Sequence, residues 1–330
     1  MSISLDLENL KVFWIAFAVS ALTSVPIMKL LALMKSKQTV SQHAPEGHQL
    51  KQGTPTMGGL IILVGFLASM PFVHTEPFRP SALPIAILVI LFAIIGFVDD
   101  YAVPKLMPGK RGLGWKQKIL MQVAAAAIPM FMVCGTDWSA IGIGVFVILF
   151  FANAYNFSDG LDGLAGTILV AMLCGMIGII PFMAGHHQIP GLPWGLLGAV
   201  LPFLYWNAPK AKVFMGDVGS LPIGAFLGGY WILSTQKLSI RSEIHNEFFY
   251  FAIGIWSLMM VAELVPVPLQ IASVKLRKKK LFPYTPIHHA FEKAGWPETR
   301  VVFVFALAQI LFSLLAITLL LITGPGVKPG

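Results

Sequence analysis

The longest uncharged stretch of this chain constrains its fold more than any other feature. From Gly163 to Pro209 the sequence contains no Asp, Glu, Lys or Arg. A helix that crosses the hydrocarbon core of a bilayer needs about 20 largely uncharged residues, so this block is long enough for two. The segment 185–193, rich in glycine and proline, divides it. Only 12% of all residues are charged, against about 25% in soluble domains, so we interpret the chain as a membrane bundle.

Ten apolar segments of this kind lie along the 330 residues. The predicted fold is therefore all-α: a polytopic integral membrane protein with ten transmembrane helices, forming a single transmembrane domain over residues 1–330. The ninth segment contains Glu263, Pro266 and Pro268, and because proline removes a helical hydrogen bond we expect this helix to be kinked or broken. The segments are approximately 12–34, 55–73, 82–98, 118–135, 138–155, 163–183, 193–207, 218–235, 248–273 and 301–323.

The positions of Lys and Arg predict the orientation of the bundle. Of the 23 basic residues, seventeen lie in loops on one side, five lie on the other, and Lys29 lies at the end of the first segment. Because basic loops face the cytoplasm, the side with seventeen is expected to be cytoplasmic and both termini periplasmic. The net charge of +8 then follows from topology, so we expect membrane lipids as neighbours and no nucleic acid as partner.

Every predicted cytoplasmic loop carries a polar cluster. An aspartate at the edge of an apolar helix is costly unless it has a partner such as a metal ion. Carboxylate and amide oxygens hold Mg²⁺ together with substrate phosphates, and lysines offset pyrophosphate charge, so the residues suit phosphoryl transfer. Adjacent residues of an α-helix point about 100° apart, so we expect the two members of the acidic pair to have different roles. Five of the fifteen acidic residues lie at these helix ends: Asp99, Asp100, Asp159, Asp162 and Asp217.

Two adjacent histidines, His288 and His289, lie in the fifth cytoplasmic loop. They point to different sides of a helix, which makes them poor joint zinc ligands, and the H-E-x-x-H pattern is absent. We therefore favour contacts from these rings to a phosphate over a zinc site. The sequence has neither a Walker lysine motif nor a dinucleotide fingerprint, so ATP-driven or NAD-dependent chemistry has no support.

The loop motifs resemble those of a known family in content and in order. They read KxGTPTMGG from Lys51, the Asp99-Asp100 pair, NxSDGLDGLAG, NxxxAxVFMGDxGS and PIHHxFExxGW, which ends at Trp296. In these motifs the chain is similar to the polyprenyl-phosphate N-acetylhexosamine-1-phosphate transferases, and most of all to those that transfer phospho-N-acetylmuramoyl-pentapeptide. The resemblance covers nearly the whole chain and includes the number of spans. Ala290 stands where the family has a third histidine.

The resemblance implies a reaction with Mg²⁺ as cofactor. Phospho-N-acetylmuramoyl-pentapeptide would pass from UDP-N-acetylmuramoyl-pentapeptide to undecaprenyl phosphate, giving lipid I and UMP in the first membrane step of peptidoglycan synthesis. The location implied is the bacterial cytoplasmic (inner) membrane, with the site facing the cytoplasm. A monomer and a homodimer both remain open.

The resemblance also implies residue roles. Asp217 is expected to bind the metal, with Asn156 as a second ligand, and Phe214 to stack on uracil. The catalytic residues implied are Asp99, Asp100, Asp217, His288 and His289. The substrate-binding residues implied are Lys51, Thr56, Asn156, Asp159, Gly160, Leu161, Asp162, Asn207, Phe214 and Gln270.

Two other functions remain open at this stage. A transferase of N-acetylglucosamine-1-phosphate would share most motifs, although PIHHxFExxGW resembles the muramoyl-pentapeptide enzymes. A transporter would also place polar residues among helices, but it would bury charges at the middle of the membrane, where only Glu263 lies. Direct attack by the lipid phosphate and a two-step route through a phospho-aspartate are both open.

Overall fold

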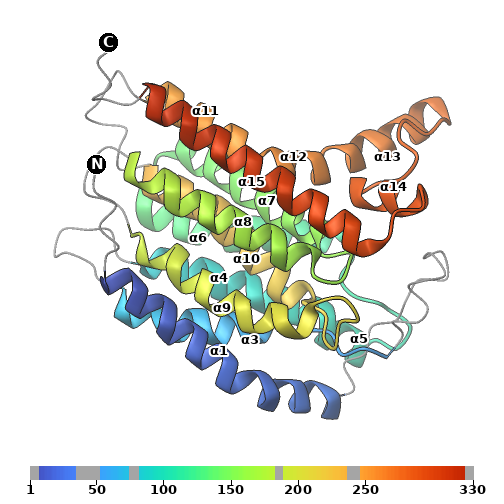
Figure 1. Cartoon of the computed structure of the whole chain (residues 1–330). Helices are drawn as coiled ribbons and strands as arrows, with labels where there is room; N and C mark the ends of the chain where they lie inside the picture. The colour runs from blue at the N-terminus through green and yellow to red at the C-terminus, as the bar shows by residue number, and fades with distance from the viewer. Residues whose placement is uncertain (1–6, 35–52, 74–81, 183–188, 236–245, 324–330) are drawn as a thin grey trace.

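The computed structural model describes residues 7–34, 53–73, 82–182, 189–235 and 246–323. The regular secondary structure within these ranges is helical, as expected from the sequence, and most helices run side by side in one bundle (Figure 1). The helices are α1 (Leu7–Leu33), α3 (Gly59–Ser69), η1 (Met70–Phe72), α4 (Leu83–Phe97), η2 (Val98–Ala102), α5 (Val103–Leu106), α6 (Trp115–Cys134), α7 (Trp138–Ser158), α8 (Leu164–Ile179), η3 (Ile180–Phe182), α9 (Gly191–Asn207), α10 (Asp217–Thr235), α11 (Asn246–Trp256), α12 (Leu258–Leu264), α13 (Pro266–Arg277), α14 (Ile287–Lys293) and α15 (Glu298–Thr323).

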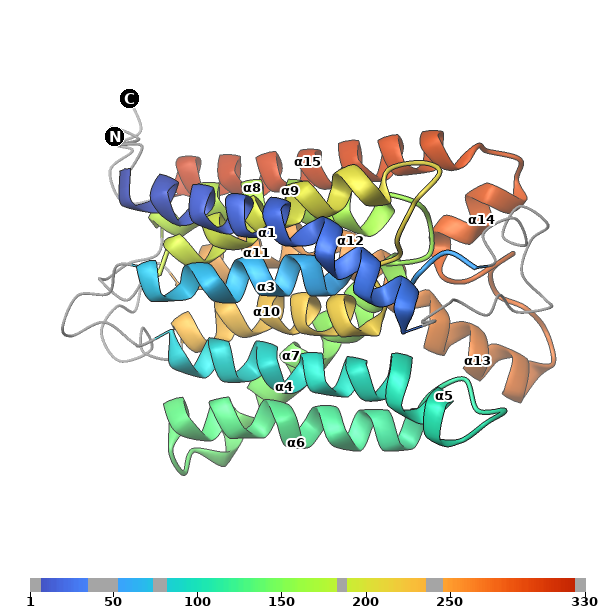
Figure 2. The ribbon, with the colours of Figure 1, turned by 90° about the horizontal axis from the view of Figure 1, so that it is seen from below.

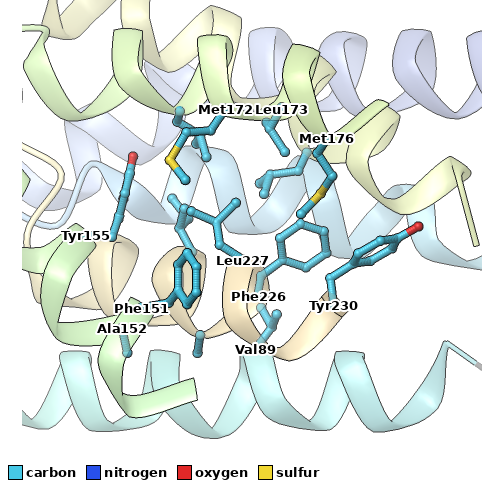
Figure 3. Close-up of a cluster of buried hydrophobic side chains, with 14 of the residues drawn as sticks. Val89, Phe151, Ala152, Tyr155, Met172, Leu173, Met176, Phe226, Leu227 and Tyr230 are labelled. Atoms are coloured by element: carbon cyan, nitrogen blue, oxygen red, sulfur yellow. The ribbon is translucent and has the colours of Figure 1, made fainter. Parts of the chain in front are cut away.

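Helix α10 lies at the centre of the bundle and packs against α7 on one side and α4 on another. Around this centre α1 packs on α9 and α3, and α15 packs on α8 and α11. Figure 3 shows side chains of α7, α8 and α10 meeting in the core, where Tyr155, Met172 and Phe226 are fully buried. Because side chains in a close-packed core interdigitate, the helices cannot slide along one another. The core therefore fixes the positions of the loops at the helix ends.

The outer surface of the bundle is apolar, which fits a membrane protein and not a soluble one. Phe146 is 70% exposed and Phe303 is 67% exposed. Seven of the described helical segments are long and apolar enough to cross a membrane, and the segments Gly59–Phe72 and Glu247–Trp256 are shorter apolar helices. The chain is thus a multi-helix protein with several candidate spans. The count of ten stays a prediction.

The two ends of the bundle differ. Helix α1 begins and α15 ends at one end, whereas α5, α13 and α14 lie at the opposite end (Figure 2). The ninth predicted span is represented by α11, α12 and α13 in succession. Between α11 and α12, the carbonyl of Trp256 accepts a hydrogen bond from Gln309 Nε2 of α15 (3.1 Å). The loops that carry the sequence motifs gather at the end where α5, α13 and α14 lie.

Candidate active site

An acidic cluster forms where η2 meets the start of α10. Asp99 and Asp100 lie on η2, a π-helical turn that continues α4, and Asp217 is the first residue of α10. One carboxylate oxygen from each residue lies within 4.8 Å of the other two. Single π-helical turns inside α-helices are frequent at functional sites. Here the turn brings both neighbouring aspartates to the same cluster.

The two neighbouring aspartates have different hydrogen-bond partners. Asp99 Oδ1 accepts a hydrogen bond from the Leu113 backbone N–H (2.6 Å). Asp100 Oδ2 accepts one from the Val218 backbone N–H (3.0 Å), at the first turn of α10. An anion at the N-terminus of a helix is favoured by the unpaired N–H groups and the helix dipole. Asp100 is therefore tied to α10, whereas Asp99 is tied to the loop before α6.

Lys118 is a site residue that the sequence analysis did not single out. Its ammonium contacts the Asp217 carboxylate and lies 3.3 Å from Asp99 Oδ2. Its side chain is 19% exposed, and those of Asp99 and Asp217 are 16% and 18% exposed, so this ion-pair network is shielded from bulk water. The only signal in the sequence is its place as the last of five basic residues between 105 and 118.

The acidic cluster fits a divalent cation. Three carboxylates beside one ammonium leave a formal charge of two negatives, and hard carboxylate oxygens are the ligands that Mg²⁺ takes in proteins. Asn156 lies next to the cluster, but its amide nitrogen is the group turned inward: it donates to Asp217 Oδ1 (2.7 Å) and to Ser220 Oγ (2.8 Å). Asp217 thus lies where a metal ligand is expected, and the second-ligand role of Asn156 stays a prediction.

Asp159 and Thr56 join the cluster through Gly216. Asp159 Oδ2 accepts a hydrogen bond from the Gly216 N–H (3.2 Å). A Cβ on Gly216 would lie 2.5 Å from Asp100 Oδ2 and 2.7 Å from Thr56 Oγ1, so only glycine fits between them. Burial raises the pKa of the Asp159 carboxyl well above its ordinary range, and the charge of Asp217 raises it further. Lys51 lies outside the described residues.

The third and fourth loops are held together by two buried polar side chains. Asn207, 2% exposed, accepts from the Gly163 N–H (3.1 Å) and donates to the Val213 carbonyl (2.8 Å). Asp162, 4% exposed, accepts from the Ala211 N–H (2.9 Å). In this structure both side chains therefore bind backbone. Their expected contact with a nucleoside stays a prediction.

Phe214 lies in the fourth loop, next to Val213, whose carbonyl accepts the hydrogen bond from Asn207. Its N–H donates to the Pro55 carbonyl (2.9 Å), and its carbonyl accepts from the Gly58 N–H (2.7 Å). The first and fourth loops are thereby joined, and Thr56 meets the acidic cluster beside Gly216. Leu161, 4% exposed, is buried in the core below the loops.

The fifth loop contacts the other loops through His288. Its Nε2 would lie 2.4 Å from a Cβ on Gly160, and its Nδ1 lies 2.8 Å from Glu263 Oε2. His289 Nδ1 lies 2.6 Å from Glu292 Oε2 on the same helix. Glu263 is the isolated charge within the ninth predicted span, and its sequence position alone indicated no role in the site.

Gln270 of α13 binds the backbone of the loop that follows this helix. Its Oε1 accepts from the N–H groups of Leu281 (2.8 Å) and Phe282 (3.0 Å), and its Nε2 donates to the Phe282 carbonyl (3.0 Å). These three bonds fasten the 278–286 loop onto α13. A contact of Gln270 with substrate stays a prediction.

Known proteins with similar sequences include several that share one name. The Phospho-N-acetylmuramoyl-pentapeptide-transferase signature 1 matches residues 51–63, and Glycosyl transferase family 4 matches residues 82–235. Three relatives are named phospho-N-acetylmuramoyl-pentapeptide-transferase. The one from Halalkalibacterium halodurans is 33% identical over 92% of this chain and 95% of its own length. That from Staphylococcus carnosus is 34% identical, covering 92% and 96%. That from Bacillus subtilis is 33% identical, covering 94% and 98%.

Identity at this level over almost the full length of both proteins extends far beyond the loop motifs. Together with the acidic cluster at the end of an apolar helical bundle, it shows that this chain belongs to the phospho-N-acetylmuramoyl-pentapeptide-transferase family.

Proposed function

We propose that this protein transfers phospho-N-acetylmuramoyl-pentapeptide from its UDP conjugate to undecaprenyl phosphate, releasing UMP and forming lipid I. The observation that carries the proposal is the cluster of Asp99, Asp100 and Asp217 with Lys118 at one end of the bundle, in a chain whose relatives bear the name of this transferase. Phosphoryl transfer needs positioning and charge compensation more than covalent chemistry by the protein. The cluster offers both.

Asp217 and its two acidic neighbours are the residues that would hold Mg²⁺, with Asn156 as a further ligand. When bound there, Mg²⁺ supplies positive charge to the pyrophosphate of the nucleotide sugar. Lys118 supplies a second positive charge from the protein itself, because it already faces Asp99 and Asp217. We assign the uridine to the loops that carry Phe214 and Thr56, together with Lys51, Asp159, Gly160, Leu161, Asp162 and Asn207.

Asp99 and Asp100 are proposed to lie beside the lipid phosphate, with the repulsion between these anions offset by Lys118 and by the Mg²⁺ that the cluster would hold. A phosphate monoester has a second pKa near 6 and is mostly deprotonated at neutral pH, so help from a general base adds little. Asp100 is held by the first turn of α10 and Asp99 by the Leu113 amide. These contacts fix the two carboxylates relative to Asp217, which is what the alignment of attacking and leaving oxygens requires.

The proposed placement is the bacterial inner membrane, with one domain of ten spans, both termini periplasmic and the site facing the cytoplasm. The split of basic residues supports it, as does the gathering of the motif loops at the end of the bundle opposite the start of α1 (Figure 2). A reporter enzyme that works only after export should be active when it is fused after Gly330. An inactive fusion, with a reporter that works only in the cytoplasm active at the same position, would contradict the orientation.

The test of the activity is a comparison of two nucleotide sugars. Protein purified in detergent is given undecaprenyl phosphate and Mg²⁺ with either UDP-N-acetylmuramoyl-pentapeptide or UDP-N-acetylglucosamine, and UMP release is measured. We expect release with the first and background with the second, and Asp217→Asn should abolish it. Release with UDP-N-acetylglucosamine alone would identify the other branch of the wider family. No release with either would reject a transferase function.

A further inference from the structure

Glu263 and His288 form a buried pair between α12 and α14. Both side chains are fully buried, with 0% of each exposed, and 2.8 Å separates His288 Nδ1 from Glu263 Oε2. Burying a carboxylate among apolar side chains is costly, and more so when its partner is removed. A carboxylate is thus kept at an apolar position of α12, where a leucine would cost nothing. Its contact with the ring is the one feature that explains its presence.

The pair is not complete within the described residues. The other two polar atoms, Glu263 Oε1 and His288 Nε2, are buried without a hydrogen-bond partner there. Buried polar atoms without partners are rare and call for a specific reason. His288 Nε2 lies against Gly160, where a Cβ would lie 2.4 Å away. The ring nitrogen therefore faces the backbone of the loop that also carries Asp159.

The carboxylate determines which ring nitrogen is available. An ionised carboxylate only accepts hydrogen bonds, so with Glu263 ionised Nδ1 is the donor, and the ring cannot turn over without losing that bond. Nε2 is then held at the Asp159–Gly160 turn. If Nε2 also carries a proton, the ring is a cation and the Glu263 carboxylate supplies the balancing charge. Such a ring donates a charge-assisted hydrogen bond to an anion.

We propose that Glu263 is a positioning residue: it holds His288 so that Nε2–H donates to a phosphate oxygen of the substrate at the Asp159–Gly160 turn. The inference rests on the proposed function. The ligand chemistry is a phosphate or diphosphate ester, because the turn adjoins the acidic cluster through the bond from the Gly216 N–H to Asp159. Glu263 itself touches no substrate and acts through the ring.

A double-mutant cycle separates positioning from support of the fold. Glu263→Gln, His288→Gln and the double variant are compared for kcat, for UMP affinity and for thermal unfolding. If Glu263 acts through His288, each single variant lowers kcat by about 100- to 1,000-fold, the range for loss of one donor to developing charge. The double variant should then be no slower than His288→Gln. UMP affinity should stay at the wild-type value in all three.

The conservative variant and a control complete the test. Glu263→Asp keeps a carboxylate and should recover part of the lost rate, and its defect should vanish on the His288→Gln background. If Glu263→Gln does not fold, Glu263→Asp takes its place in the cycle. Gln309→Leu removes another buried polar side chain, one that contacts the Trp256 carbonyl, and should lower the unfolding temperature while leaving kcat unchanged.

Three results would overturn the inference. These are wild-type turnover in Glu263→Gln, rate losses that multiply in the double variant, and a loss of UMP affinity as large as the loss of kcat. The wild-type protein is assayed first with both substrates. An inactive wild type rejects the proposed function, whereas an active wild type with an unaffected Glu263→Gln rejects only the positioning role.

Discussion

Replacing Lys118 by Met should change metal binding and catalysis in opposite directions. The Lys118 ammonium contacts Asp217 and lies 3.3 Å from Asp99 Oδ2, so it occupies part of the cluster that a divalent cation would use. A cation entering this cluster has to displace the ammonium from at least one carboxylate. In Lys118→Met nothing has to be displaced, and three carboxylates face one another without compensation.

The magnitude follows from the contact that is lost on displacement. A hydrogen bond to a charged group contributes about 1.5–3 kcal/mol, and each 1.4 kcal/mol is about a tenfold change in a dissociation constant. Lys118→Met should therefore bind a divalent cation about 10- to 100-fold more tightly in the absence of substrate. Its kcat should fall by at least about tenfold, because one positive charge that compensates the pyrophosphate is gone.

The assay is a titration of Mn²⁺ by electron paramagnetic resonance, with kcat measured on the same samples. Lys116→Met is the matched control, since Lys116 is an exposed residue of the same helix that lies over the Trp115 ring. It should leave both values unchanged. Equal or weaker Mn²⁺ binding by Lys118→Met would refute competition between the ammonium and the metal.

Four further substitutions test the rest of the site and the packing of the bundle. Asp217→Asn should abolish turnover at ordinary Mg²⁺ while the protein stays folded, and near-normal turnover would exclude it from the metal site. Phe214→Ala should weaken UMP binding by about 1–3 kcal/mol, the value of base–aromatic stacking, whereas His289→Ala should lose product formation more than UMP affinity; equal losses of affinity in a UMP titration would contradict this division. Gln309→Leu should lower stability by about 1–3 kcal/mol by leaving the Trp256 carbonyl unpaired, as read from thermal unfolding, and an unchanged unfolding temperature would contradict it.

The sequence predicted the helical class and the residues of the acidic cluster because both leave local signals. Long apolar runs are visible in a single chain, and an aspartate at the end of such a run is costly enough to be conspicuous. Asp99, Asp100 and Asp217 therefore stood out although more than 100 residues separate the pair from Asp217. The structure brings their oxygens to within 4.8 Å.

Contacts that depend on packing could not be predicted in the same way. Lys118 is one of several lysines around the start of α6, and only the alignment of α6 with η2 and α10 selects it. The role proposed for Glu263 depends on α14, which places His288 beside it. Asn207 has side-chain groups that could bind a nucleoside or backbone equally well, and in the structure it binds the backbone of Gly163 and Val213.

The most direct test of the central claim follows the two phosphates of the nucleotide sugar. UDP-N-acetylmuramoyl-pentapeptide labelled with ³²P at either the α- or the β-phosphate is incubated with purified protein, undecaprenyl phosphate and Mg²⁺, and lipid is separated from the aqueous phase. Transfer of the phospho-sugar predicts that the β-label moves into the lipid and that the α-label remains in water as UMP. Retention of the β-label in the aqueous phase, or entry of the α-label into the lipid, would contradict it.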